Sequence, residues 1–265
     1  MVRILFIGDI VGEPGRKAIA QGVPLLIERE QVHLVVANSE NAAGGNGVTP
    51  PIVRALLESR VDLLTSGNHA WDKKEGVAIY DQEPRLLRPA NYPTTGYYHT
   101  PGVGATVIRA KNDVKVGVLN LMGRVFLDSL DCPFQVADRE LPRLTQETKV
   151  ILVDMHAETT SEKKAMAFFL EGRVSAVVGT HTHVQTADEQ ILEKGTAFIS
   201  DVGMTGPHDS VIGMDKKQVL QKFLTKRPLK YEVAKNNIRL QGVILDIDEA
   251  TGKALAIRRV NESLR

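Results

Sequence analysis

The chain has 265 residues, with 33 Lys and Arg against 32 Asp and Glu, which gives a formal net charge of +1. This balance provides no overall field for nucleic acid or for an anionic membrane, and a single cysteine, Cys132, excludes an internal disulfide framework. The length suits one large core, so we expect a single domain over residues 1–265 in a reducing, cytoplasmic compartment. No apolar run is long enough to predict a signal peptide or a membrane span.

Short apolar runs recur along the chain and predict β-strands. They are rich in β-branched residues and nearly continuous, which is typical of strands that are covered on both faces. A later segment, 242–260, predicts a hairpin with its turn at 250–252. The predicted strands are VRILFIGD (2–9), VHLVVANSEN (32–41), VDLLTSGNH (61–69), VKVGVLNL (114–121), VILVDMH (150–156), SAVVGTHTH (175–183) and TAFISDVG (196–203).

Helical segments alternate with these strands and favour an α/β layered sheet. The best marked one has Ser161 as a candidate N-cap and ends before Gly172. The segment 91–142 contains many Pro, Gly and Tyr residues around one strand, and we interpret it as a cap or insertion over one edge. The basic run 221–230 fits either a solvated helix end or a phosphate-binding patch. The predicted helices are 15–30, 50–59, 73–80, 161–171 and 216–225.

Five of the predicted strands end in side chains that bind metals or transfer protons. The carboxyl ends of strands in an α/β sheet form the edge where ligand sites assemble, so we expect these side chains to converge. His181 and His183 are two residues apart and would point the same way if that segment stays extended. The residues at the strand ends are Asp9, Glu40, Asn41, Asn68, His69, His156, His181 and His183.

The donor types at these ends indicate a metal centre. Imidazoles, carboxylates and amide oxygens without a thiolate suit Fe, Mn, Zn or Co. The set is too large for one tetrahedral ion but suits two ions that share a carboxylate. Such a pair, roughly 3.5 to 4 Å apart, holds phosphate oxygens and activates a bridging water for in-line attack, which predicts a hydrolase of phosphate esters.

Ordinary structural roles remain open for single members of this set. Asp9 would serve as a turn residue, and His156 as a buried structural histidine. The glycines around Asp9 lack the GxGxxG spacing of a dinucleotide site. However, every one of these ordinary interpretations would have to be true at the same time. The joint arrangement of the residues therefore favours a functional site.

Six segments resemble the signature segments of the YmdB-type metallophosphoesterases, a branch of the binuclear calcineurin-like phosphoesterases. The resemblance covers nearly the whole chain. It implies a four-layer α/β/β/α fold, a centre of two Fe or Mn ions, and phosphodiesterase activity on 2′,3′-cyclic nucleotides. The segments are GDIVG, SENAAGGNG, TSGNHAWDKKE, DMHAETTSEK, GTHTHVQTAD and ISDVGMTGPHDSVIGMD.

The resemblance also implies roles for single residues. His69 would face the substrate as the general acid that protonates the departing ribose oxygen, while Trp71 and Asp72 pack and orient its loop. Asp9, Glu40, Asn41 and His183 would hold one ion, and Glu40, Asn68, His156 and His181 the other, with Glu40 bridging.

The chain departs from the wider superfamily at three of these positions. Val11 stands where a histidine is usual, Glu40 replaces the usual bridging aspartate, and Ala70 replaces an acid that supports the catalytic histidine. We expect carboxylate support for the histidines to come from Asp154, Glu158 or Asp201.

The sequence therefore predicts a metal-dependent phosphodiesterase acting on a small nucleotide or another phosphodiester. A phosphomonoesterase is the nearest alternative, with Arg16, Lys73 or Arg124 meeting a dianionic phosphate. A slow-turnover nucleotide sensor is the alternative from another class, and an RNA-processing partner stays open. We expect no membrane association, and we expect a homo-oligomer from general frequency alone.

Overall fold

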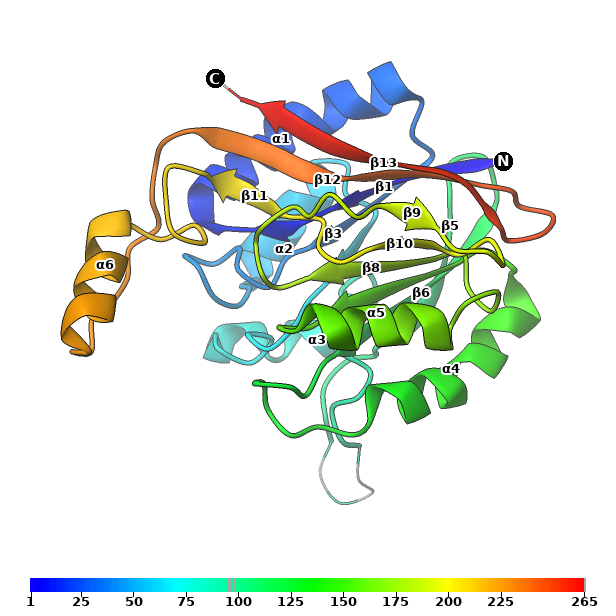
Figure 1. Cartoon of the computed structure of the whole chain (residues 1–265), viewed down its shortest axis with the longest axis horizontal. Helices are drawn as coiled ribbons and strands as arrows, with labels where there is room; N and C mark the ends of the chain where they lie inside the picture. The colour runs from blue at the N-terminus through cyan, green and yellow to red at the C-terminus, as the bar shows by residue number, and fades with distance from the viewer. Residues whose placement is uncertain (95–96, 98, 265) are drawn as a thin grey trace.

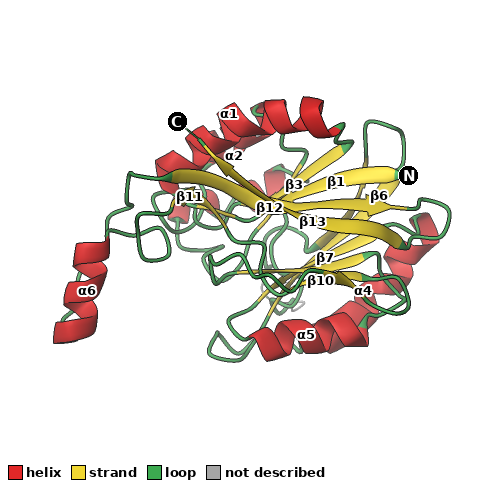
Figure 2. Cartoon of the chain, turned by 45° about the horizontal axis from the view of Figure 1, so that its top comes forward, coloured by secondary structure: helices red, strands yellow, loops and turns green. Residues whose placement is uncertain are grey.

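The computed structural model describes residues 1–94, 97 and 99–264. Two β-sheets face each other, and helices cover the outer face of each sheet (Figures 1 and 2). The order of layers is helix, sheet, sheet, helix, which confirms the predicted α/β/β/α fold. Within the described residues, no helix is both long enough and apolar enough to cross a membrane.

The first sheet has a parallel centre and antiparallel additions. β1, β3 and β4 run parallel, with Ile4 beside Leu34 and Val36 beside Leu63. The C-terminal hairpin joins the other side of β1, where β12 pairs with it antiparallel. In order across the sheet, the strands are β2 (Asp9–Ile10), β11 (Met204–Pro207), β12 (Ile238–Ile247), β1 (Val2–Ile7), β3 (Leu34–Asn38) and β4 (Leu63–Thr65), with β13 (Ala254–Ser263) paired to β12.

The second sheet is built mainly from the middle of the chain. Its four central strands run parallel, and the two edge strands are antiparallel to their neighbours. In order, the strands are β5 (Ala105–Arg109), β6 (Lys115–Met122), β7 (Ile151–His156), β8 (Ala176–Thr180), β10 (Ala197–Ile199) and β9 (Gln190–Ile191). The helices are α1 (Gly12–Glu30), α2 (Pro50–Glu58), α3 (Ile79–Gln82), α4 (Pro133–Glu147), α5 (Thr160–Phe169), α6 (Lys216–Thr225) and the 3-10 helix η1 (Lys74–Gly76).

Three apolar layers hold these four structural layers together. In β1, Leu5 packs outward with Ile19 of α1, while Phe6 packs inward with Val118 of the second sheet. A third cluster packs α4 and α5 on the outer face of that sheet. Because each central strand is covered on both faces, its sequence is almost continuously apolar instead of alternating.

Several predicted boundaries differ from the structure. Strands β3, β4 and β8 end before their polar residues, which lie in the loops that follow. The predicted helix 73–80 is instead the 3-10 helix η1 followed by the short α3. Gly76 is the last residue of η1, and only glycine fits there, because a Cβ would lie 2.1 Å from the carbonyl oxygen of Val48. The hairpin turn at 250–252 and the other four predicted helices are present.

The segment 91–142 contributes to the second sheet. It contains β5 and β6 as well as the first part of α4, and α4 packs on the outer face of the sheet. Residues 95, 96 and 98 of this segment lie outside the described residues. Within the described residues, β5, β6 and α4 are therefore parts of the layered core.

Candidate metal centre

The ends of five strands from both sheets meet at one site. In the first sheet, Asp9 begins β2, two residues after the end of β1, and Glu40 and Asn41 follow β3. His156 is the last residue of β7, in the second sheet. Short contacts connect the predicted metal ligands into two groups, one around His156 and one around His183.

The first group surrounds a ring nitrogen of buried His156. Nε2 of His156 lies 3.0 Å from Oδ1 of Asn68, 3.2 Å from Oε1 of Glu40 and 3.1 Å from Nδ1 of His181. Ligand atoms of Glu40, His156 and His181 all lie within 4.8 Å of one another. The four residues therefore present nitrogen and oxygen atoms to a common point.

Hydrogen bonds fix the tautomer of His156. The hydroxyl of Thr180 donates to Asp154 over 2.7 Å, so it accepts from Nδ1 of His156 over 2.9 Å. In a neutral ring, Nε2 then carries a lone pair that faces the oxygens of Asn68 and Glu40. Lone pairs facing one another require a cation or a proton between them, which is the arrangement that a metal ion satisfies.

The second group joins His183, Asn41 and Asp9. Nδ1 of His183 donates to the carbonyl of Ile212 over 2.9 Å, which leaves Nε2 facing Oδ1 of Asn41 at 3.2 Å and Oδ1 of Asp9 at 3.8 Å. The amide nitrogen of Asn41 donates to the carbonyl of Gly45, so its oxygen points to the site. Oδ1 of Asp9 is buried and has no hydrogen-bond partner. Buried polar atoms are seldom unpaired, so this oxygen fits a metal ligand.

The electrostatics of the two groups also favour a cation. Burial raises the pKa of Asp9 to about 6, although His183 and His156 oppose the shift. Burial works against charge on Glu40 and His156 as well, but their mutual attraction prevails, lowering the pKa of Glu40 and raising that of His156. Without an ion, a proton on Nε2 of His156 therefore faces Oε1 of Glu40, and a bound metal ion would displace that proton. Burial and then the charge of His156 lower the pKa of His181 to about 3, so its ring is neutral and available as a ligand.

Residues 181–183 are not extended, so the condition for His181 and His183 to point the same way along a strand is not met. Their φ angles are +100° and +63°, so the chain turns sharply after β8. Asp201 holds this turn, because its Oδ2 accepts from the backbone nitrogen of Thr182 at 3.0 Å and from its hydroxyl at 2.7 Å. The same oxygen accepts from the buried Lys163 at 2.8 Å. A buried ion pair, and not the pleat of a strand, directs both rings to the site.

The carboxylates expected to support the histidines have different positions. Oε2 of Glu158 lies 3.0 Å from Nε2 of His181, whereas Asp154 reaches His156 only through Thr180. Asp201 contacts Thr182 and not an imidazole. Sequence reasoning overlooked Thr180 and Lys163, since a threonine inside a strand and a lysine inside a helix carry no local signal of such a role.

Gly67 is a further position that sequence reasoning overlooked. A Cβ at this residue would lie 2.2 Å from Nε2 of His156 and 2.3 Å from Oε2 of Glu40. We therefore expect Gly67→Ala to displace both ligands and to lower the bound metal to less than half an equivalent, measured by elemental analysis. Gly117→Ala is the matched control, because a Cβ there would meet only ordinary contacts at 3.4 Å or more. Equal metal content in both variants would contradict this geometry.

His69 lies beside the donor groups, with its side chain 35% exposed. Its Nδ1 is 2.8 Å from Oδ2 of Asp72, and the same oxygen accepts from Asn46. Although burial opposes it, these hydrogen bonds lower the pKa of Asp72, so the carboxylate is charged. The acid missing at Ala70 is thus supplied two residues further along. Trp71 packs edge-on against Tyr80 and Tyr92, which positions this loop.

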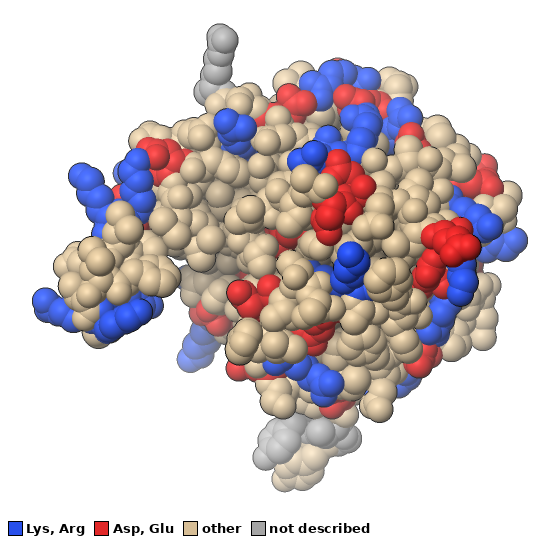
Figure 3. All heavy atoms as spheres, in the orientation of Figure 1, with Lys and Arg blue, Asp and Glu red and all other residues tan. Residues whose placement is uncertain are grey.

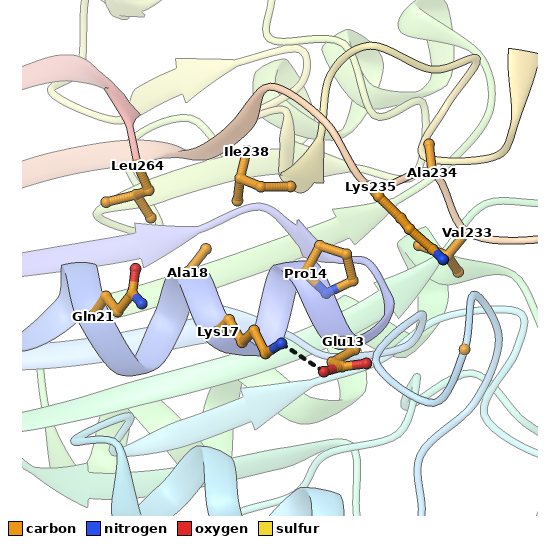
Figure 4. A pocket seen from close by; sticks show the side chains of 11 residues that line it. Glu13, Pro14, Lys17, Ala18, Gln21, Val233, Ala234, Lys235, Ile238 and Leu264 are labelled. Carbon is orange, nitrogen blue, oxygen red and sulfur yellow. Dashed lines mark ion pairs between the residues drawn. The ribbon is translucent and has the colours of Figure 1, made fainter.

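The site opens into a cleft of about 890 Å³. Glu40, His69 and His181 line one part of it, and Lys230 and Tyr231 line another. A second cavity, of about 550 Å³, lies between α1 and residues 233–238 (Figure 4). Its charged pair, Lys17 and Glu13, is satisfied at 2.7 Å, and none of the predicted metal ligands lines it.

Two facing sheets with this donor cluster at their common edge define a metallophosphoesterase sandwich. The chain belongs to the family of YmdB-like proteins, whose family model matches residues 5–260. It is 49% identical to a 2′,3′-cyclic-nucleotide 2′-phosphodiesterase of Bacillus subtilis, over 98% of this chain and 96% of that protein. These findings confirm the family that the sequence motifs predicted.

Two solved structures share the whole fold. A hypothetical protein of Thermus thermophilus superposes with a TM-score of 0.91 and 41% identity, over 99% of both chains. A structure described as a novel phosphatase of Mycoplasma pneumoniae has a TM-score of 0.92 and 34% identity, over 99% of this chain and 93% of that one.

Proposed function

We propose that this chain is a metal-dependent phosphodiesterase that hydrolyses 2′,3′-cyclic nucleotides, with His69 as general acid. The observation that carries the proposal is the set of nitrogen and oxygen atoms gathered around Nε2 of His156, directly beside the partly exposed His69. The identity of 49% with a 2′,3′-cyclic-nucleotide 2′-phosphodiesterase supports the substrate class.

The donor set fits two ions of a metal such as Fe or Mn. Asn68, His156 and His181 would hold one ion, and Asp9, Asn41 and His183 the other, with Glu40 shared between them. When bound, such ions polarise phosphate oxygens and lower the pKa of a water molecule that attacks phosphorus. The chain's own contribution is to orient these donors: backbone nitrogens of His69 and His181 donate to one carboxylate oxygen of Glu40 and of Asp9, respectively.

His69 would protonate the departing ribose oxygen. Asp72 accepts from Nδ1, so it holds the ring in one orientation. The proton on Nε2 is then the one available for the leaving group, and the Asp72 carboxylate stays charged throughout. The partial exposure of the ring allows it to be protonated again from solvent.

We expect His69→Ala to lower kcat for 2′,3′-cyclic AMP by about 10²- to 10⁴-fold, the usual contribution of a general acid. Metal content should stay unchanged, because His69 is outside both donor groups. An aryl phosphodiester with a p-nitrophenolate leaving group is the control substrate, because p-nitrophenolate departs without needing a proton. The substitution His69→Ala should therefore lower kcat much less for this substrate than for 2′,3′-cyclic AMP. Equal losses for both substrates would show that His69 is not the acid.

A phosphomonoesterase remains the second candidate, favoured by the solved relative described as a phosphatase and by Lys73, which lines the cleft and could meet a dianion. Arg16 is less suited, because its guanidinium donates to the carbonyl of Ala42. Comparing kcat/KM for bis-p-nitrophenyl phosphate and p-nitrophenyl phosphate separates the candidates. A clear preference for the monoester would replace the proposed diesterase activity.

A further inference from the structure

Residues 216–231, here termed the basic arm, project from the body of the molecule beside the site. α6 forms most of the arm and stands apart from the sheets in both views (Figures 1 and 2). A bridge between Met214 and Val233 closes its base. Only Val219 is buried in α6, while the side chain of Phe223 is 65% exposed. Packing therefore does not explain the composition of the arm.

The arm carries a concentrated positive charge. Its 16 residues include six Lys and Arg and no Asp or Glu, in a chain whose net charge is +1. Figure 3 shows Lys and Arg side chains gathered on the projecting part. Lys216 pairs with Asp209 at 2.5 Å, and among the described residues no carboxylate lies within 4.0 Å of the other five cations. These are Lys217, Lys222, Lys226, Arg227 and Lys230.

The base of the arm forms part of the cleft that contains the metal donors. Lys230 and Tyr231 line it together with Glu40 and His181. The ammonium group of Lys222 lies 4.9 Å above the ring of Tyr231, so the arm's charge continues to the cleft wall. The cleft, about 890 Å³, is near the upper end of the range for small-molecule sites. The same cleft thus borders both the metal donors and the base of the basic arm.

We infer that the basic arm binds the sugar-phosphate chain of an oligoribonucleotide whose 2′,3′-cyclic phosphate end lies at the metal donors. The inference builds on the proposed function and names its substrate more narrowly. Lys and Arg side chains without a carboxylate partner neutralise successive phosphates. The rings of Phe223 and Tyr231 each have a Lys ammonium over one face, and a base would stack on the other face. A mononucleotide would leave the arm without a ligand.

A lipid surface would also attract exposed apolar and basic residues. The position of Lys230 and Tyr231 favours the nucleic acid, because these residues belong to the arm and to the catalytic cleft at once. A bilayer against the arm would lie across the opening of that cleft. An oligonucleotide instead needs an arm that continues into the cleft, because its terminal phosphate must enter the cleft while the rest of the strand lies along the arm.

The test compares kcat/KM for 2′,3′-cyclic CMP with that for an oligoribonucleotide of about ten residues ending in the same group. We expect the oligonucleotide to be preferred roughly tenfold or more, and the preference to disappear in Lys217→Gln/Lys226→Gln/Arg227→Gln. For a single strand, each cation that no longer neutralises a phosphate should reduce the slope of log affinity against log salt by about 0.7, so three substitutions reduce it by about 2.

A second triple variant controls for general charge. Lys149→Gln/Lys194→Gln/Lys253→Gln removes three cations around a different cavity, and it should keep both the preference and the salt slope. Binding of a 3′-phosphate oligonucleotide, followed by fluorescence anisotropy, gives a readout independent of turnover. The arm variant should bind it at least tenfold more weakly than the control variant does.

The remaining outcomes distinguish the two proposals. Hydrolysis of cyclic CMP without preference for the oligonucleotide would overturn the role of the arm and leave the proposed function intact. Failure to hydrolyse either substrate would overturn the proposed function and the inference with it. Arm-dependent binding to phosphatidylglycerol vesicles, with no oligonucleotide preference, would assign the arm to a lipid surface and overturn the inference.

Discussion

Glu40→Gln is expected to lower kcat by about 10³-fold or more and to remove at least one of two bound metal ions. The substitution keeps the shape of the side chain but removes the charge of a carboxylate whose Oε1 lies 3.2 Å from Nε2 of His156, and it exchanges one of the two oxygens for an amide nitrogen. Several kcal/mol of transition-state stabilisation depend on the ions, and about 1.4 kcal/mol corresponds to each factor of ten. Elemental analysis together with turnover of 2′,3′-cyclic AMP measures both effects.

Glu158→Gln provides the graded control for Glu40. Glu158 contacts His181 from the solvent side, with its own side chain 48% exposed, so we expect only a 10- to 100-fold loss of metal affinity. Excess Mn²⁺ should restore activity to this variant and not to Glu40→Gln. Two full equivalents of metal in Glu40→Gln would contradict the assignment of Glu40 as the shared ligand.

Lys163→Met is expected to lower the free energy of unfolding by about 3 to 5 kcal/mol, the usual cost of breaking a buried ion pair. Lys163 and Asp201 are both buried and lie 2.8 Å apart, so the substitution leaves a buried carboxylate without its counter-ion. Because Asp201 also holds Thr182 between the two site histidines, metal affinity should fall as well, by 10- to 100-fold. Urea denaturation and calorimetric metal titration check the two effects.

The control for Lys163 is a Lys–carboxylate pair on the surface. Lys115 and Glu147 lie 3.2 Å apart with nearly half of each side chain exposed. Since exposed pairs contribute little, Lys115→Met should change the free energy of unfolding by less than about 1 kcal/mol and leave metal affinity unchanged. If both substitutions lowered the free energy of unfolding by a similar amount, burial would not be the reason for the large contribution of the Lys163–Asp201 pair.

The strand predictions succeeded because burial on both faces leaves a local signature. An apolar run such as VRILFI is visible without knowledge of its neighbours, and so is a polar residue at its end. The edge strand β5 and the helix α4 were not predicted. β5 is only partly buried, so its run is short, and α4 contains Pro142 within the helix, which predicts a break although the structure accommodates it.

The sequence by itself determined the chemistry of this protein: its central strands, the carboxylate, amide and imidazole residues that follow them, and the family to which the chain belongs. These are properties of residue type and local order. Only the tertiary structure decided which lone pairs face one another, how residues 181–183 turn, and that the basic arm borders the cleft. The first two depend on contacts between residues distant in the chain, such as Thr180 with Asp154 and Lys163 with Asp201, and no local pattern encodes such contacts.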